Sequence, residues 1–269
     1  MNTTVIIGGE NSALDVVAEV EYFGPLNITI PPLSVAVYGN TAVYINGTLY
    51  SCGGYSANGA CYKYDLAANS GSWVRFTTIP GDSQHSPAVA FDDFFWYFNN
   101  QIQQVPVNGS SVTSYDWGLG YQGCAVGNGS HTVVIQSANR SVLMNSDAST
   151  PINWTTVTEI NDVLLARGCL WLGNTIYVTG GFDIGANAID TTELINSDTF
   201  EVTLAAPLPV GVWNHKMGVI DGLPAVFGGY TTGYLVLSSI YIYDYDTNTW
   251  SLSDRSVPGG RTLFGSATF

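Results

Sequence analysis

Residues 225–250 read AVFGGYTTGYLVLSSIYIYDYDTNTW. In this stretch an apolar run ends in the diglycine Gly228-Gly229, a second apolar run carries Tyr243, and Trp250 follows. The turn sequence Asp221-Gly222 stands just before the first run. Short apolar runs bounded by glycine and turn residues are typical of antiparallel strands. The stretch therefore predicts a small unit of β-strands.

The same arrangement recurs along the chain. Diglycine pairs that end an apolar run are Gly8-Gly9, Gly53-Gly54, Gly180-Gly181 and Gly228-Gly229, at intervals of 45, 127 and 48 residues. Weaker matches at residues 96–100 and 133–137 fill the long interval. Aromatic residues follow in phase at Trp73, Trp117, Trp154, Phe200 and Trp250. A period of about 45 residues indicates six repeats of one unit.

Each unit reads as four short strands. A first strand, a tight turn such as Asn46-Gly47, and a second strand lead into the diglycine; a loop, a third strand, a turn and an aromatic strand follow. Asn-Gly between apolar runs favours a two-residue hairpin turn. Four such strands cannot bury both faces of their sheet alone, but sheets packed radially against their neighbours can.

This pattern resembles the kelch repeat, in which a hydrophobic run into Gly-Gly is followed by a tyrosine and then a tryptophan. The match is best at Gly53, Gly54, Tyr64 and Trp73, and at Gly228, Gly229, Tyr243 and Trp250. After Gly180 and Gly181, Phe200 stands in the place of tryptophan. The resemblance implies an all-β fold, a six-bladed kelch-type β-propeller of four-stranded antiparallel blades.

The two ends of the chain supply incomplete units. Residues 1–9 contain a second strand that ends at Gly8-Gly9, and residues 260–269 resemble a first strand. We expect the C-terminal strand to join the N-terminal blade, one strand plus three, and so to close the ring. A single propeller domain, residues 1–269, would then comprise a closing blade (1–31 plus 260–269) and blades 1 to 5 at about 35–77, 85–118, 121–158, 166–205 and 212–254.

Four cysteines are present, and their spacing alone leaves three pairings open. In the blade arrangement, Cys52 and Cys61 flank one loop, whereas Cys124 and Cys169 fall in the innermost strands of consecutive blades. We therefore prefer the disulfides Cys52–Cys61 and Cys124–Cys169 over free buried thiols. Two disulfides favour an oxidising compartment.

Seven Asn-x-Ser/Thr sequons point to the same compartment. They begin at Asn2, Asn27, Asn46, Asn108, Asn128, Asn139 and Asn153. Turn asparagines that happen to precede serine or threonine are the alternative. The opening residues lack the features of a signal peptide, so a secreted, extracellular glycoprotein with N-linked glycans is an inference from sequons and cysteines.

Charge and motifs exclude several classes. Seven basic residues against 21 acidic ones give a net charge of −14 and leave no basic patch for nucleic acid. No apolar run reaches the roughly 18 residues of a membrane-spanning helix, so we expect no membrane insertion. His85, His131 and His215 are not clustered with cysteine or carboxylate ligands, and nucleophile and phosphate-loop motifs are absent. We therefore predict no catalytic residue, metal or cofactor.

Kelch propellers most often bind partners through loops at one face. The loops after the diglycines are Glu10–Ala13, Tyr55–Ala60, Phe182–Thr192 and Tyr230–Leu237. We expect a non-catalytic extracellular binding or structural scaffold that contacts a protein partner, or another copy in a larger assembly, through residues 160–250, where no sequon lies. A glycan-binding propeller with Trp96, Trp171 or Trp213 as stacking platform, and a carbohydrate-active enzyme with loop-borne carboxylates, are the alternatives.

Overall fold

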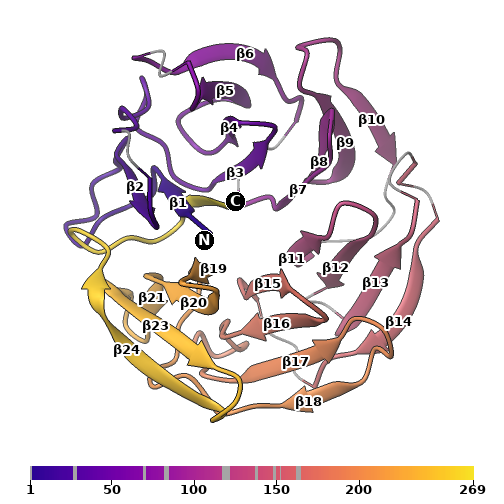
Figure 1. The fold of residues 1–269 in the computed structure, drawn as a ribbon, viewed down its shortest axis with the longest axis vertical. Helices are drawn as coiled ribbons and strands as arrows, with labels where there is room; N and C mark the ends of the chain where they lie inside the picture. Colours follow the sequence, from indigo (N-terminus) through magenta and orange to yellow (C-terminus); the bar gives the residue numbers. More distant parts are fainter. Residues whose placement is uncertain are drawn as a thin grey trace. The chain divides into compact units, whose positions relative to one another are not determined.

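A computed structural model describes residues 2–26, 29–68, 71–81, 85–116, 122–136, 139–147, 150–151, 153–161 and 165–269. The sequon residue Asn27 and the repeat residue Trp117 lie outside this part of the chain. By its internal contacts the chain divides into two compact units, residues 1–119 with 263–269, and residues 120–262. Three of the described antiparallel sheets in each unit are blades of the propeller (Figure 1). The second unit also contains a two-stranded sheet within residues 230–236.

The first unit holds the closing blade and blades 1 and 2. The closing blade is β25 (Gly265–Thr268), β1 (Thr4–Ile7) and β2 (Val20–Phe23). Blade 1 is β3 (Asn40–Ile45), β4 (Thr48–Gly53), β5 (Ala60–Asp65) and β6 (Val74–Thr78). Blade 2 is β7 (Ala88–Ala90), β8 (Phe94–Phe98), β9 (Gln101–Pro106) and β10 (Thr113–Asp116).

The second unit holds blades 3 to 5. Blade 3 is β11 (Gln122–Gly127), β12 (Thr132–Gln136), β13 (Ser141–Asn145) and β14 (Thr155–Glu159). Blade 4 is β15 (Gly168–Leu172), β16 (Thr175–Thr179), β17 (Thr192–Asn196) and β18 (Val202–Leu204). Blade 5 is β19 (Lys216–Ile220), β20 (Leu223–Phe227), β23 (Ser239–Asp244) and β24 (Thr249–Ser256). The six-bladed, all-β fold predicted from the repeat is confirmed.

The C-terminal strand joins the N-terminal blade, as predicted. β25 pairs antiparallel with β1, with Thr4 opposite Thr268 and Ile7 opposite Gly265. The yellow end of the chain therefore lies beside the indigo β1 in Figure 1. Three strands of this blade are described instead of four. Beyond β2, the amides of Leu33 and Val37 donate to carbonyls of the segment before β2, at 2.8 and 3.1 Å, rather than to β2 itself.

The diglycines are hydrogen-bonded joints between a blade and the segment that leads to the next one. The second glycine donates its N–H to a carbonyl of that segment: Gly9 to Val37 at 2.6 Å, Gly181 to Val212 at 2.8 Å and Gly229 to Arg261 at 2.7 Å. The first glycine packs on the same oxygen, because a Cβ on Gly8, Gly180 or Gly228 would lie 2.5, 2.3 or 2.2 Å from it. Both glycines have positive φ, so no other residue fits without strain.

A second joint precedes the inner strands. The residues Gly39, His85, Ala166, Asn214 and Leu263 all have φ between 51° and 70°. In the first unit, the N–H of Gly39 donates to Leu263 at 2.6 Å and that of His85 to Gly39 at 2.8 Å. In the second unit, Asn214 donates to Ala166 at 3.0 Å. The left-handed backbone turns each N–H toward the preceding blade, although most of these residues are not glycine.

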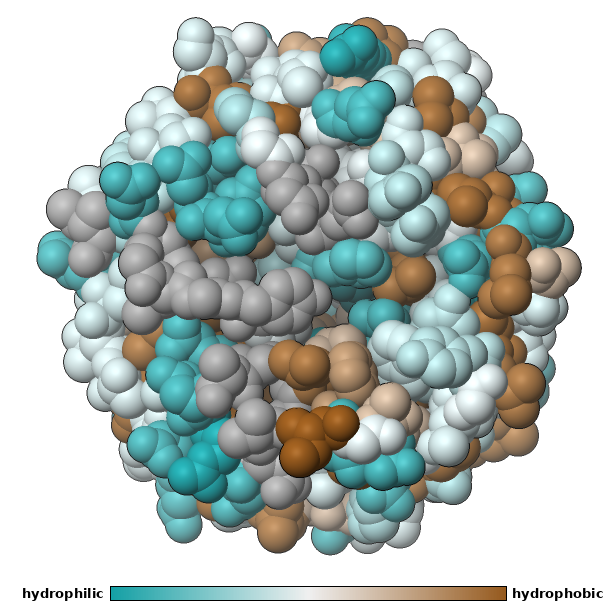
Figure 2. Space-filling model, turned by 180° about the vertical axis from the view of Figure 1, so that it is seen from behind, coloured by the Kyte–Doolittle hydropathy of each residue, from teal (hydrophilic) through white to brown (hydrophobic). Residues whose placement is uncertain are grey.

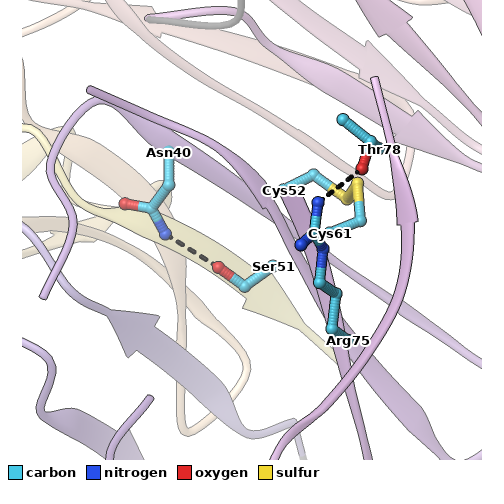
Figure 3. The surroundings of a disulfide bond; sticks show 6 residues. All are labelled: Asn40, Ser51, Cys52, Cys61, Arg75 and Thr78. Carbon is cyan, nitrogen blue, oxygen red and sulfur yellow. Dashed lines mark hydrogen bonds between the residues drawn. A yellow bond between two sulfur atoms is a disulfide. The ribbon is translucent and has the colours of Figure 1, made fainter. Parts of the chain in front are cut away.

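Both expected disulfides are present. Cys52 and Cys61 lie opposite one another on β4 and β5, with 4.1 Å between their Cα atoms. Figure 3 shows this pair next to the hydrogen bond from Arg75 to Thr78 (2.9 Å), with the hydrogen bond from Asn40 to Ser51 (3.0 Å) to one side. Cys124 and Cys169 join the inner strands β11 and β15, with 6.1 Å between Cα atoms. This second bond crosses from blade 3 to blade 4.

A buried polar cluster lies beside the Gly180 joint. The fully buried side chains of Arg167 and Glu193 form an ion pair, with 2.5 Å between Nη2 and Oε2. The other carboxylate oxygen of Glu193 accepts both the backbone and side-chain N–H groups of Asn161, at 2.6 and 2.8 Å. His215 Nε2 and the Thr179 hydroxyl are 2.8 Å apart. An unpaired charge would be costly here, so the ion pair holds the segment entering blade 4 against β17. The contact between His215 and Thr179 joins the segment entering blade 5 to blade 4.

Substitution of Gly180 by alanine tests the joint. A Cβ there would meet the Val212 carbonyl at 2.3 Å at φ +57°, whereas Gly222 has φ +86° with nothing within 4 Å. Gly222→Ala should cost about 1–2 kcal/mol of left-handed strain, and Gly180→Ala about 1–3 kcal/mol more for the clash. Urea unfolding of both variants measures the difference. Equal losses would contradict the close approach.

Acid should destabilise the second unit through His215. Burial, followed by the nearby Lys216 and Arg167 charges, lowers the pKa of His215 from 6.5 to about 3. Between these values the unfolded chain binds a proton that the folded chain does not, so the free energy of unfolding falls as the pH drops below about 6.5. In His215→Gln this slope should decrease by up to about 1.4 kcal/mol per pH unit. Thermal unfolding at several pH values measures this slope. Parallel profiles of stability against pH for the wild type and His215→Gln would contradict this assignment.

Candidate functional site

The strands of each blade give it two different ends. Turns that join the first strand to the second, and the third to the fourth, lie at one end, which we call the hairpin end. Loops that follow the diglycines, and the segments that enter the inner strands, lie at the opposite end, which we call the diglycine end. In blade 5 these are the Asp221-Gly222 turn and the loop after Gly228-Gly229.

The loops at the diglycine end differ in length and in their backbone pairing. In blade 2 the two residues Asn99 and Asn100 join β8 to β9 directly. In blades 4 and 5 the loops instead run over residues 180–191 and 228–238. They carry their own pairing, because Phe182 bridges both Leu165 and Ala188, and β21 (Tyr230–Thr231) pairs with β22 (Leu235–Val236). The long loops of blades 4 and 5 are therefore held by backbone pairing of their own.

Aromatic side chains from the two long loops pack together. The Trp213 ring centroid lies 4.9 Å from Phe182, 4.8 Å from Tyr230 and 5.3 Å from Tyr234, the last contact being edge to face. Trp213 and Tyr230 also form a backbone bridge, and the Ala188 amide donates to the Thr232 hydroxyl at 3.3 Å. We call Phe182, Trp213, Tyr230 and Tyr234 the aromatic loop cluster.

Apolar side chains around this cluster are open to solvent. Ile184 is 102% exposed, Leu235 65% and Tyr234 61%, and Trp213 is partly exposed. We call these four residues the exposed loop surface. On the face shown in Figure 2, hydrophobic residues lie in small groups among pale and teal ones, so isolated apolar exposure is common in this molecule. The exposed loop surface differs because Trp213 and Tyr234 are held by a ring contact and Leu235 lies in the paired strand β22.

The turn that presents Ile184 is fixed by Asp183. Its carboxylate accepts the amides of Gly185 at 2.8 Å and Asn187 at 2.9 Å, together with the Asn187 side chain. The Asn187 hydrogen bonds, side chain before backbone, lower the pKa of Asp183. A carboxylate held by local N–H groups is a typical turn device. It keeps Ile184 at the tip of the loop.

The position after the diglycine is aromatic in three blades. Tyr55 stacks on Tyr38 in the first unit, with 5.2 Å between ring centroids, and its amide donates to the Tyr38 carbonyl at 2.9 Å. Phe182 and Tyr230 occupy the same position in blades 4 and 5. Burial, then the Tyr55 hydroxyl and Glu10, raises the pKa of Tyr38. The residue just after Gly-Gly is thus a sequence signal for this end of the blade.

The predicted sequon asparagines gather at the hairpin end. Those described there are Asn2, Asn46, Asn108, Asn128 and Asn153, whereas Asn139 lies at the diglycine end of blade 3. All of these are exposed except the partly buried Asn2. The Asn46 side-chain N–H donates to the Asp92 carbonyl at 2.8 Å, while Asn108, Asn128 and Asn139 accept amides within their own turns. None of them lies in blade 4 or 5.

The tyrosine and tryptophan of the repeat are structural. Tyr64 and Trp73 have ring centroids 5.6 Å apart, and Tyr243 and Trp250 5.0 Å. The indole N–H of Trp73 donates to the Pro31 carbonyl at 2.8 Å and that of Trp250 to Ala206 at 3.1 Å. Both acceptors lie in the segment entering the same blade. Trp73, Trp154 and Phe200 precede the fourth strand instead of lying inside it, which corrects the sequence assignment.

The residues considered for glycan stacking or for acidic chemistry are buried or take part in local hydrogen bonds. Trp96 is only 2% exposed, so it cannot be a stacking platform, and the Trp171 indole N–H donates to Gly173 at 3.1 Å. Asp244 accepts the amide of Asp246 at 2.9 Å, as in a turn. Among the described residues, no group of three histidine, cysteine or acidic side chains could hold a metal. Within the same residues, no helix has the length and hydropathy to cross a membrane.

Comparison with known families agrees with the repeat. A family model described as the kelch motif matches residues 214–252, which span blade 5 and the two strands of its long loop. The comparison with curated proteins finds no similar sequence. The matched segment contains Gly228, Gly229, Tyr243 and Trp250, whose contacts recur in the other blades. The chain is thus a six-bladed β-propeller that carries a kelch motif, and the two findings together support the kelch-repeat family.

Proposed function

We propose that this kelch propeller is an extracellular, N-glycosylated, non-catalytic scaffold that binds a protein partner through the exposed loop surface of blades 4 and 5. One observation carries the proposal: Trp213, Tyr234, Leu235 and Ile184 are presented to solvent on ordered loops. Tryptophan and tyrosine dominate the binding energy of many protein interfaces. A contiguous exposed apolar patch on a soluble protein is typical of an interaction site.

The placement of the sequons supports the same surface. Glycans at Asn46, Asn108, Asn128 and Asn153 would project from the hairpin ends of their blades, and one at Asn139 from the diglycine end of blade 3. The exposed loop surface lies at the diglycine end of blades 4 and 5, which carry no sequon. Two disulfides in a chain of this size are compatible with secretion. The loops on which the partner would dock therefore carry no glycan of their own.

Two other uses of the loops deserve comparison. Self-association through the same residues would make the scaffold part of a larger extracellular assembly. Glycan binding would use the faces of Trp213 and Tyr234, whose rings meet at 83°. Self-association and glycan binding both predict contact at the diglycine end of blade 5. The mass of the bound molecule distinguishes a second copy or a glycan from a different protein.

A photo-crosslinking amino acid at two matched positions tests the proposed surface. Tyr234 and Tyr245 are 61% and 59% exposed, and they lie at the diglycine and hairpin ends of blade 5, respectively. With p-benzoylphenylalanine at position 234, on protein secreted by its native cells, we expect a protein adduct that position 245 does not give. Equal adducts at both positions, or none at 234, would contradict the proposal.

Glycosylation is tested at two exposed hairpins. Asn108 and Asn128 are exposed, and the Oδ1 atom of each accepts a backbone amide within its own turn. In protein secreted from eukaryotic cells we expect peptide N-glycosidase to convert both to aspartate, seen by mass spectrometry. The double variant Asn108→Gln, Asn128→Gln should lose two glycans. Unmodified asparagine at both positions of the secreted protein would refute the glycoprotein assignment.

A further inference from the structure

The charges beside the exposed loop surface have one sign. Asp183 lies next to Ile184, and Asp190 follows Ile189, whose carbonyl accepts the Val212 amide at 3.0 Å beside Trp213. The basic side chains of the neighbouring segments are withdrawn from solvent: Arg167 and Arg261 are 4% and 3% exposed, and Lys216 is partly buried. With a net charge of −14 for the whole chain, the local potential is negative.

The indole N–H of Trp213 differs in its hydrogen bonding from those of four other tryptophans. The indole N–H groups of Trp73, Trp154, Trp171 and Trp250 donate to backbone carbonyls. The Trp213 indole N–H donates to no residue in the part of the chain that the structure describes, although its ring is held on three sides by Phe182, Tyr230 and Tyr234. The face of a tryptophan ring attracts a cation, and Asp183 and Asp190 lie on the same loop as Phe182, which contacts Trp213.

We infer that the partner docks a segment in which apolar side chains flank an arginine or lysine. The apolar side chains would cover Ile184 and Leu235, and the cation would lie against Trp213 and Tyr234 with Asp190 nearby. This inference rests on the proposed function and specifies the chemistry of its partner. A second copy fits less well, because two chains of charge −14 repel each other before contact.

Selection from a random dodecapeptide phage library tests the inference on the full chain. The test variant is Ile184→Ser, Tyr234→Ser, Leu235→Ser. A matched control is Leu204→Ser, Tyr245→Ser, Leu252→Ser, whose wild-type side chains are 66%, 59% and 66% exposed at other parts of blades 4 and 5. Thermal unfolding first establishes that both variants are folded. We expect peptides rich in arginine or lysine beside apolar residues, bound by the wild type and the control but at least about tenfold more weakly by the test variant.

Two substitutions then isolate the charge. Replacing the basic residue of a selected peptide by glutamine should weaken binding about 3- to 30-fold, as loss of a cation–π contact would. Asp190→Asn, which leaves the Asp183 turn intact, should weaken it less and make it less sensitive to salt.

The outcomes separate the two proposals. Peptides that require the exposed loop surface but show no basic enrichment would overturn the cationic partner and leave the binding function standing. Peptides that bind the test variant as well as the wild type, or a failure to select any, would overturn both. Sedimentation of the wild type as a dimer that only the test variant abolishes would assign the surface to a second copy and refute the inference.

Discussion

One hydrogen bond sets the geometry of three diglycine joints: the N–H of Gly9, Gly181 or Gly229 donates to a carbonyl of the segment that enters the next blade. The carbonyl approaches so closely that the first glycine has no room for a Cβ, as Gly180 and Gly228 show. The residue after the pair therefore leaves each blade at a fixed place. Phe182 and Tyr230 are that residue in blades 4 and 5, so the joint also positions the aromatic loop cluster.

Much of the fold could be predicted because its determinants are local. The diglycine phase, the closure of β25 on β1 and the two disulfides follow from short motifs and from their spacing. The left-handed joints could not be predicted, since Ala166, Leu263 and His85 carry no glycine signal at positive φ. Tertiary hydrogen bonds impose that conformation on them.

The candidate site was located only as a range, residues 160–250. Its residues depend on contacts between loops: Trp213 meets Phe182 and Tyr230 through bridges that no local pattern encodes. The structure also gives the position of the sequons within the blades: most of the described sequon asparagines lie at the hairpin ends. The buried contact between Thr179 of β16 and His215, which precedes β19, links blade 4 to blade 5, so their loops can present a preformed surface.

Residue-resolved hydrogen exchange of the joint amides is the most direct test of this account. Gly181 and Gly229 follow the ends of β16 and β20, outside the regular ladders, and their N–H groups are bonded at 2.8 and 2.7 Å. The account predicts that both amides exchange as slowly as those in the middle of β16 and β20. Exchange as fast as that of the exposed turn residue Gly222 would contradict it, because the loops would then have no fixed base.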